Sequence, residues 1–130
     1  MSEDGQLVLS VDDEQSFHEI VRTVIEAGGF RVEEACDGEE AIKKAMELRP
    51  QIILLDMKMP GMSGAEVLTK LKEHDETKDI PVIFLTNFGD PRVEFESDKH
   101  FANQVGAQAF VSKSKLAEEL LPKVRSILNK

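Results

Sequence analysis

The chain has 130 residues, a length that suits one domain with a single core. Acidic residues number 25 and basic residues 16, so the formal net charge is −9 at pH 7, which argues against a nucleic-acid-binding surface. No apolar stretch approaches the roughly 18 residues that span a bilayer, and the start has no signal-peptide pattern, so we expect a cytoplasmic protein without membrane insertion.

Short apolar runs alternate with amphipathic stretches five times along the chain, which indicates β-α units around a parallel sheet. The runs are rich in Val, Ile, Leu and Phe, as is typical of strands that are buried on both faces. In chain order, the strands are predicted at Gln6–Val11, Phe30–Ala35, Gln51–Leu55, Ile80–Leu85 and Gln108–Val111.

Amphipathic helices are predicted after the first three strands and after the fifth. The first helix ends at Gly28-Gly29, and its apolar face consists of Phe17, Ile20, Val21, Val24 and Ile25. In the second and third helices, the apolar positions are Ala41, Ile42, Ala45, Met46, Val67, Leu68 and Leu71. The last helix presents Leu116, Leu120, Leu121, Val124, Ile127 and Leu128. Pro122 has no N–H to donate within it, so we expect this residue to bend the helix or to face solvent.

The fourth connection, residues 87–104, is long, charged and only sparsely apolar. Asp90-Pro91 is suited to begin a helix there, because aspartate caps helices and proline fits their first turn. The chain has no internal repeat or linker, and the last helix uses up its end. We therefore expect one domain over residues 1–130, with a core from about residue 6 to residue 129.

An open parallel sheet binds ligands beyond the carboxyl ends of its strands, at the point where the strand order reverses. In a five-stranded sheet of order 2-1-3-4-5, this point lies between the first and third strands. Asp37 follows the second strand at the far edge, so we expect it to cap a helix instead. The residues that the other four strand ends bring together are Asp12, Asp13, Asp56, Thr86 and Lys113.

These side chains suit phosphoryl transfer. Three carboxylates in one crevice repel one another unless a cation compensates, and oxygen ligands without histidine or thiolate favour Mg²⁺ or Mn²⁺. Asp13 is expected to be the principal metal ligand, supported by Asp12. Lys113 offers a positive charge and Thr86 a hydroxyl for phosphoryl oxygens, while the Asp56 carboxylate is the expected nucleophile.

Each of these residues also has a simpler interpretation. Asp13 alone would be a helix cap, Asp56 a loop carboxylate, Lys113 a solvated charge and Thr86 an ordinary strand-end residue. The coincidence of four strand ends favours the phosphoryl-transfer interpretation. Outside this set, we expect the lone Cys36 to be a buried, unreactive residue. We expect three further residues to lie on the surface without a function: His18, His74 and His100.

The motif set resembles the receiver domain of two-component response regulators. The similarity is carried by VDDE at residues 11–14, IILLDMKMPGMSG at residues 52–64, Thr86 and Lys113, and it covers nearly the whole chain. The resemblance implies a flavodoxin-like (βα)5 three-layer sandwich and a single-domain response regulator of a phosphorelay.

The resemblance also implies a mechanism. A histidine kinase or histidine phosphotransfer protein would donate a phosphoryl group to Asp56 in a Mg²⁺-dependent reaction, and acetyl phosphate can replace such donors. The receiver would catalyse only its own phosphorylation and dephosphorylation, and so would not be an enzyme for free substrates. The Lys58 carbonyl would be a metal ligand, while Thr86 and Phe110 would form the switch that signals to an unknown downstream protein.

Some positions depart from the family pattern. Ser114 follows Lys113 where the family commonly has proline, so we expect a trans peptide there or a strained cis one, with Ser114 as a cap of the last helix. Asn87 replaces a small residue, and the segment between residues 86 and 113 is longer than usual. These departures leave open a receiver-like interaction module that ignores phosphorylation. A magnesium-dependent phosphohydrolase is disfavoured, because Lys58 stands where such enzymes commonly have a second aspartate.

Overall fold

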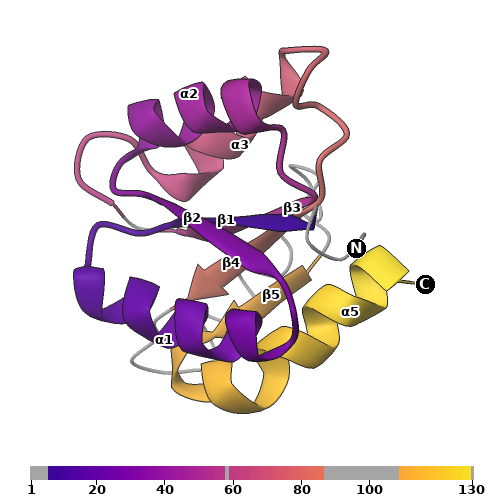
Figure 1. The fold of residues 1–130 in the computed structure, drawn as a ribbon. Helices are drawn as coiled ribbons and strands as arrows, with labels where there is room; N and C mark the ends of the chain where they lie inside the picture. The colour runs from indigo at the N-terminus through magenta and orange to yellow at the C-terminus, as the bar shows by residue number, and fades with distance from the viewer. Residues whose placement is uncertain (1–5, 58, 87–108, 130) are drawn as a thin grey trace.

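In the part of the chain that the structure describes, the fold is built on one parallel sheet of five strands (Figure 1). The computed structural model describes residues 6–57, 59–86 and 109–129, so the predicted 87–104 connection and His100 lie outside the described residues. The strand order β2-β1-β3-β4-β5 is the predicted one, and each strand end lies within two residues of its expected position. The strands are β1 Leu7–Val11, β2 Arg31–Ala35, β3 Ile52–Asp56, β4 Val82–Thr86 and β5 Ala109–Ser112.

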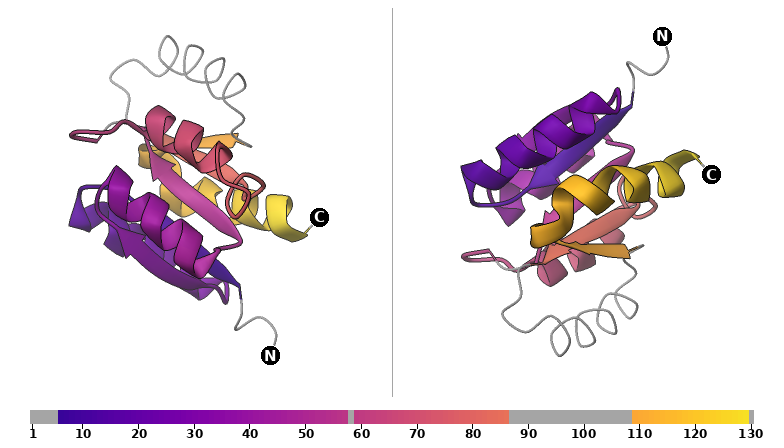
Figure 2. Two further views of the ribbon diagram at one scale, coloured as in Figure 1. Left: turned by 90° about the horizontal axis from the view of Figure 1, so that it is seen from above. Right: turned by 90° about the horizontal axis from the view of Figure 1, so that it is seen from below.

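Helices cover both faces of the sheet, which confirms the predicted three-layer α/β sandwich. Helices α2 and α3 lie together on one face, and α1 lies on the other beside the helical segment that ends the chain (Figures 1 and 2). Within the described ranges, no helix is long and apolar enough to cross a bilayer. The bounds are α1 Gln15–Ala27, α2 Gly38–Leu48, α3 Gly64–Lys72, η2 Lys113–Lys115, η3 Leu116–Leu120 and α5 Leu121–Asn129.

Two apolar layers flank the sheet because neighbouring residues of a strand point to opposite faces. In β3, Ile53 and Leu55 pack toward α2 and α3, whereas Ile52 and Leu54 pack toward α1 and α5. All five residues of β1, β3 and β4 are buried. The continuous apolar runs in the sequence therefore correspond to strands that are covered on both sides, as predicted.

The pairing register brings the carboxyl ends of the central strands level. Val11 of β1 pairs with Leu55 of β3, so Asp12 and Asp56 are the next residues at the same edge of the sheet. Thr86 pairs with Ser112 in the same way, which places Lys113 just beyond β5.

Helix α1 is turned about its axis relative to the predicted orientation. Its buried residues are His18, Val21 and Ile25, and Ile20 is 42% exposed. Two expectations are therefore wrong, because His18 is in the core and Ile20 is outside it. On a helix with about 100° between successive residues, the two lie on opposite sides of the Phe17–Val21–Val24 stripe. A rotation of the buried face toward one position exposes the other.

His18 is held by two buried hydrogen bonds. Its Nε2 lies 2.8 Å from the Asp12 carbonyl oxygen, and its Nδ1 lies 3.0 Å from Ser10 Oγ. A carbonyl can only accept, so Nε2 donates to it; in the neutral imidazole, Nδ1 then accepts from the Ser10 hydroxyl. Each ring nitrogen of the buried imidazole therefore has a hydrogen-bond partner, which is why a histidine is accommodated in the core.

The chain ends in a helical segment of changing geometry. Its first part, η3, is π-helical, and α-helical hydrogen bonding begins at Leu121, directly before Pro122. Pro122 is exposed, as one of the two predicted outcomes requires. Pro122 has no N–H to donate, and the change from π-helical to α-helical geometry falls directly before it.

Cys36 is exposed, and the expectation that it is buried is wrong. It follows the last residue of the edge strand β2 and precedes α2, so only one side of it meets the protein. The pKa of its thiol is raised, first by partial desolvation and then by the nearby carboxylates of Glu40 and Glu34. A raised pKa disfavours the thiolate, in keeping with the expected low reactivity.

Gly64 allows α3 to begin directly against the end of β3. Its N–H donates to the Met57 carbonyl at 2.9 Å, and the Ser63 hydroxyl caps the helix. A Cβ atom at this position would collide with the backbone oxygen of Asp56 and would lie 2.9 Å from Cα of Met57. The strand end that carries Asp56 therefore depends on a residue without a side chain.

We predict that His18→Leu lowers the free energy of unfolding by about 1–3 kcal/mol for each of the two polar groups it leaves unpaired. Urea denaturation would measure the loss. Adding Ser10→Ala should recover part of it, since the orphaned hydroxyl is then removed. His74→Leu, at a half-buried histidine in the loop after α3, is the matched control and should have a small effect. An unchanged midpoint in His18→Leu would contradict the assigned role.

We predict that Gly64→Ala destabilises the chain by about 1–3 kcal/mol, because backbone atoms cannot yield to the added methyl group as a side chain would. Gly61→Ala in the same loop is the control. Gly61 has a φ of +84°, and no atom of the described residues lies within 4 Å of an added Cβ, so its substitution carries only a conformational cost of about 1 kcal/mol. Equal losses in the two variants would refute the proposed collision.

Candidate functional site

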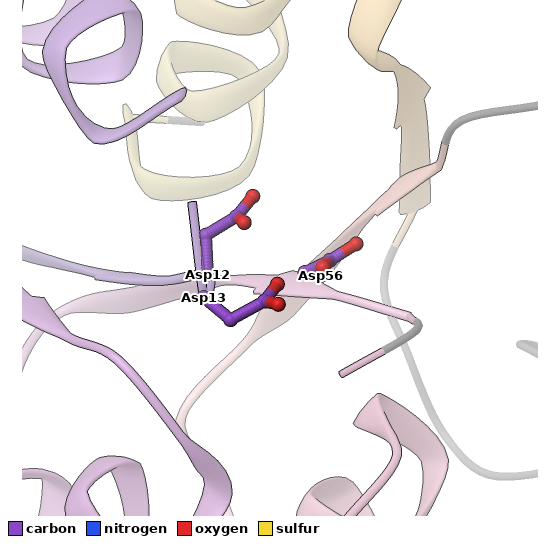
Figure 3. Close-up of side chains that lie close together, drawn as sticks. All are labelled: Asp12, Asp13 and Asp56. Carbon is purple, nitrogen blue, oxygen red and sulfur yellow. The ribbon is translucent and has the colours of Figure 1, made fainter. Parts of the chain in front are cut away.

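Three carboxylates meet beyond the carboxyl ends of β1 and β3. Each of Asp12, Asp13 and Asp56 offers an oxygen, and these oxygens lie within 4.8 Å of one another (Figure 3). Asp12 and Asp56 are buried, at 1% and 5% exposure, whereas Asp13 is exposed. The structure thus places the three predicted aspartates together, with one carboxylate exposed to solvent and two buried.

Lys113 reaches this cluster from the end of β5. Its ammonium nitrogen lies 2.7 Å from Asp12 Oδ2 and 3.3 Å from Asp56 Oδ1, and its side chain is 6% exposed. The side chain is therefore not a solvated surface charge, and Asp56 is a buried strand-end residue instead of a loop carboxylate. A buried ammonium is stable here because two opposite charges face it.

Asp12 also builds the start of α1. Its Oδ1 accepts a hydrogen bond of 2.9 Å from the Glu14 N–H, while Oδ2 faces Lys113. The N-cap of α1 is Glu14, without a side-chain capping bond, so Asp13 does not have the alternative role of helix cap. The Asp13 carboxylate instead lies in the cluster with Asp12 and Asp56. Asp37 caps α2 through a 2.8 Å bond from the Glu40 N–H, as expected for the carboxylate at the far edge.

Thr86 lies at the same edge of the sheet, but its hydroxyl is turned toward β5. The buried Oγ1 donates to the Val111 carbonyl at 3.5 Å, which is long for such a bond. The hydroxyl is therefore engaged weakly, and by the backbone. Lys58 and the Phe110 side chain, expected as metal ligand and switch, lie outside the described residues.

The peptide bond between Lys113 and Ser114 is trans, one of the two expected outcomes. The expectation that Ser114 caps the last helix is wrong, because Ser114 lies inside the η2 turn and the N-cap of η3 is Lys115. The η2 turn itself is capped by Ser112, whose hydroxyl accepts from the Ser114 N–H at 3.3 Å. Despite the missing proline, the Lys113 side chain reaches both buried carboxylates.

The donor set fits a hard divalent cation. The cluster contains three carboxylates and no histidine or thiolate ligand, and Mg²⁺ is commonly held by carboxylates and water. With all four groups ionised, three carboxylates and one ammonium give a net charge of −3 + 1 = −2, which one divalent cation balances. Asp12 Oδ2 is buried, and the group that faces it among the described residues is the Lys113 ammonium at 2.7 Å.

The sequence did not reveal that the Phe17 ring also contacts this site. The Lys113 ammonium lies 4.0 Å from the centroid of that ring. In the sequence, Phe17 is one of several apolar residues on α1, and only its place in the first turn after Asp12-Asp13 sets it apart. The His18 contact with the Asp12 carbonyl was missed for the same reason, since a single side chain carries no pattern.

The chain is similar to a family of known proteins and to individual members of it. Residues 8–125 match the family described as "Response regulator receiver domain". The chain is 32% identical to the phosphate regulon transcriptional regulatory protein PhoB of Pseudomonas aeruginosa over 97% of its own length and 53% of that protein, so it spans about half of this relative. It is 34% identical to the polar-differentiation response regulator DivK of Brucella anthropi, over 93% of its own length and 94% of that protein.

The fold has counterparts among solved structures. The chemotaxis protein CheY4 of Vibrio cholerae superimposes with a TM-score of 0.83 at 32% sequence identity, covering 95% of this chain and 98% of that one. The family match spans most of the chain, including both buried aspartates and Lys113. The chain therefore belongs to the response regulator receiver domain family.

Proposed function

We propose that residues 1–130 form a single receiver domain of a two-component phosphorelay, which accepts a phosphoryl group on Asp56 from a histidine kinase or a histidine phosphotransfer protein. Receiver domains are phosphoacceptors, not enzymes for free substrates. The observation that carries the proposal is the meeting of Asp12, Asp13, Asp56 and Lys113 at one point of the sheet edge.

In the proposed reaction, an oxygen of the Asp56 carboxylate attacks phosphorus, and the bond from phosphorus to the donor's histidine nitrogen breaks. The imidazole leaves with the bond's electron pair, and Asp56 becomes an acyl phosphate. Later, water attacks the same phosphorus, releasing inorganic phosphate and restoring the carboxylate. Lys113 places a positive charge beside the transferred group at both stages.

Mg²⁺ fits the proposed site. Asp12, Asp13, Asp56 and the Lys58 carbonyl would hold it, and its charge would offset that of the phosphoryl oxygens. The chain's own task is to keep these oxygens together. Asp12 is kept in place by its bond to the Glu14 N–H, and its backbone by His18. Mn²⁺ has similar ligand preferences and could replace Mg²⁺.

The proposed switch begins at Thr86. Its 3.5 Å bond to the Val111 carbonyl is weak enough to be exchanged for a phosphoryl oxygen, a stronger acceptor. Phe110 lies on the paired strand β5, opposite Phe84 of β4, and would move with Thr86. New contacts of this kind shift the population between two conformations, which a downstream protein partner would recognise.

A receiver-like module that ignores phosphorylation has less support. Ser114 was one reason to consider it, but the Lys113 side chain is buried against both carboxylates regardless. The other reasons, Asn87 and the long fourth connection, lie outside the described residues.

We predict that incubation with Mg²⁺ and acetyl phosphate adds the mass of one phosphoryl group, and that Asp56→Asn abolishes the addition because an amide cannot act as the nucleophile. Intact-protein mass spectrometry would measure it. Asp37→Asn is the matched control: the substituted residue still caps α2 and lies outside the cluster, so phosphorylation should be unchanged. Full modification of Asp56→Asn would show that the nucleophile lies elsewhere.

We predict opposite effects of Lys113→Met on metal binding and on phosphorylation. Removing one positive charge from the cluster should tighten Mg²⁺ binding about threefold to tenfold. The phosphorylation rate should fall about 100-fold, because the charge beside the transferred group is lost. Calorimetry and acetyl phosphate kinetics would measure the two effects. Lys115→Met, at an exposed lysine of the same turn, should change neither quantity. A loss of both properties together would contradict the assigned role.

A further inference from the structure

The Lys113 ammonium has an aromatic neighbour besides its two carboxylates. It lies 4.0 Å from the centre of the Phe17 ring. A cation is attracted to the face of an aromatic ring when the two are within about 6 Å of each other. Because the lysine side chain is nearly buried, little water screens this attraction. Asp12 and Phe17 lie on either side of the start of α1, and Asp56 ends β3, so two separate segments contact the ammonium.

The ring differs from the two carboxylates in what it does during the proposed reaction. Asp12 and Asp56 are both candidate ligands of the divalent cation, and Asp56 is also the expected phosphoacceptor. A change at either carboxylate alters its ion pair with Lys113. The Phe17 ring carries no net charge and binds neither a metal nor a phosphoryl group. Its attraction for the ammonium therefore persists whatever occupies the carboxylates.

Local structure places the ring where it can act in this way. Phe17 is in the first turn of α1, and its N–H donates to the Glu14 carbonyl at 3.1 Å. The same turn begins where Asp12 accepts the Glu14 N–H. The Asp12 carboxylate and the Phe17 backbone are thus both hydrogen-bonded to Glu14, which limits the relative movement of the carboxylate and the ring.

We propose that Phe17 is a positioning residue for Lys113: the face of its ring holds the ammonium beside Asp56, so that a positive charge is in place when phosphoryl oxygens arrive. This inference rests on the proposed phosphoryl transfer to Asp56. A purely apolar packing role of Phe17 in the layer between α1 and the sheet is the alternative, and the two make different predictions.

The test compares Phe17→Leu and Phe17→Tyr with the unaltered chain, using acetyl phosphate and saturating Mg²⁺. Leucine retains an apolar side chain without a π face, and tyrosine retains the face. We expect the phosphorylation rate to fall about fivefold in Phe17→Leu and to stay near that of the unaltered chain in Phe17→Tyr. Phe30→Leu is the matched control, since Phe30 packs against the same apolar layer but precedes β2 at the opposite end of the sheet.

Fluorination separates ring electrostatics from packing. Replacing Phe17 by phenylalanine with one, two and three ring fluorines changes its shape little but weakens the negative face stepwise. The phosphorylation rate should then fall stepwise, while the urea midpoint stays nearly constant. In parallel, the NMR signals of the Lys113 ε-methylene group should show a ring-current shift that Phe17→Leu removes and Phe17→Tyr keeps.

The possible outcomes are distinct. A rate that is insensitive to fluorination, or that falls only together with stability, would overturn the positioning role while leaving Asp56 phosphorylation intact. If the unaltered chain takes up no phosphoryl group at all, the proposed function fails, and the positioning role fails with it. A stepwise fall in rate at constant stability, with Phe30→Leu unchanged, supports the proposal.

Discussion

The buried contact of the Lys113 ammonium with Asp12 and Asp56 ties together the carboxyl ends of β1, β3 and β5. Removing a lysine charge from water is costly, and a buried ion pair at best offsets that cost. The contact is therefore a poor candidate for a device that stabilises the fold. In the proposed phosphoryl-transfer site, the Lys113 ammonium would instead serve to bind the anionic oxygens of the phosphoryl group.

Asp12 has two tasks that use different oxygens. Oδ1 begins α1 by accepting the Glu14 N–H, and Oδ2 faces Lys113. The Asp12 backbone is in turn held by His18, which also bonds Ser10 near the carboxyl end of β1. The Asp12 residue thus contacts the Lys113 ammonium, the start of α1 and a core histidine at the same time.

Membership of the receiver domain family does not identify the protein to which this domain signals. The chain aligns with about half of PhoB from Pseudomonas aeruginosa, a transcriptional regulatory protein, and with nearly all of DivK from Brucella anthropi. One receiver architecture thus occurs in proteins of different length and role. The fold therefore says little about the downstream partner, because function depends on the particular surfaces that each chain presents.

The sequence by itself determined the alternation of strands and helices and the set of polar side chains that follow the strands, whereas the strand order 2-1-3-4-5 came from the general topology of open parallel sheets. The first two follow from local patterns: apolar runs of strand length, helical periodicity, and polar residues directly after strands. Asp12, Asp13, Asp56 and Lys113 were predictable as a group because the topology of a parallel sheet brings strand ends together, wherever the individual side chains point.

Only the tertiary structure decided the orientation of α1, and with it the positions of His18, Ile20 and Phe17. A helix with an apolar stripe can turn by a fraction of its circumference at little cost in its own sequence pattern, so the choice depends on the surface it meets. Here, Ser10 and the Asp12 carbonyl offered His18 two hydrogen bonds in the core, and the Lys113 ammonium met the Phe17 ring. Such partners are distant in the sequence or belong to the backbone, and therefore leave no local pattern.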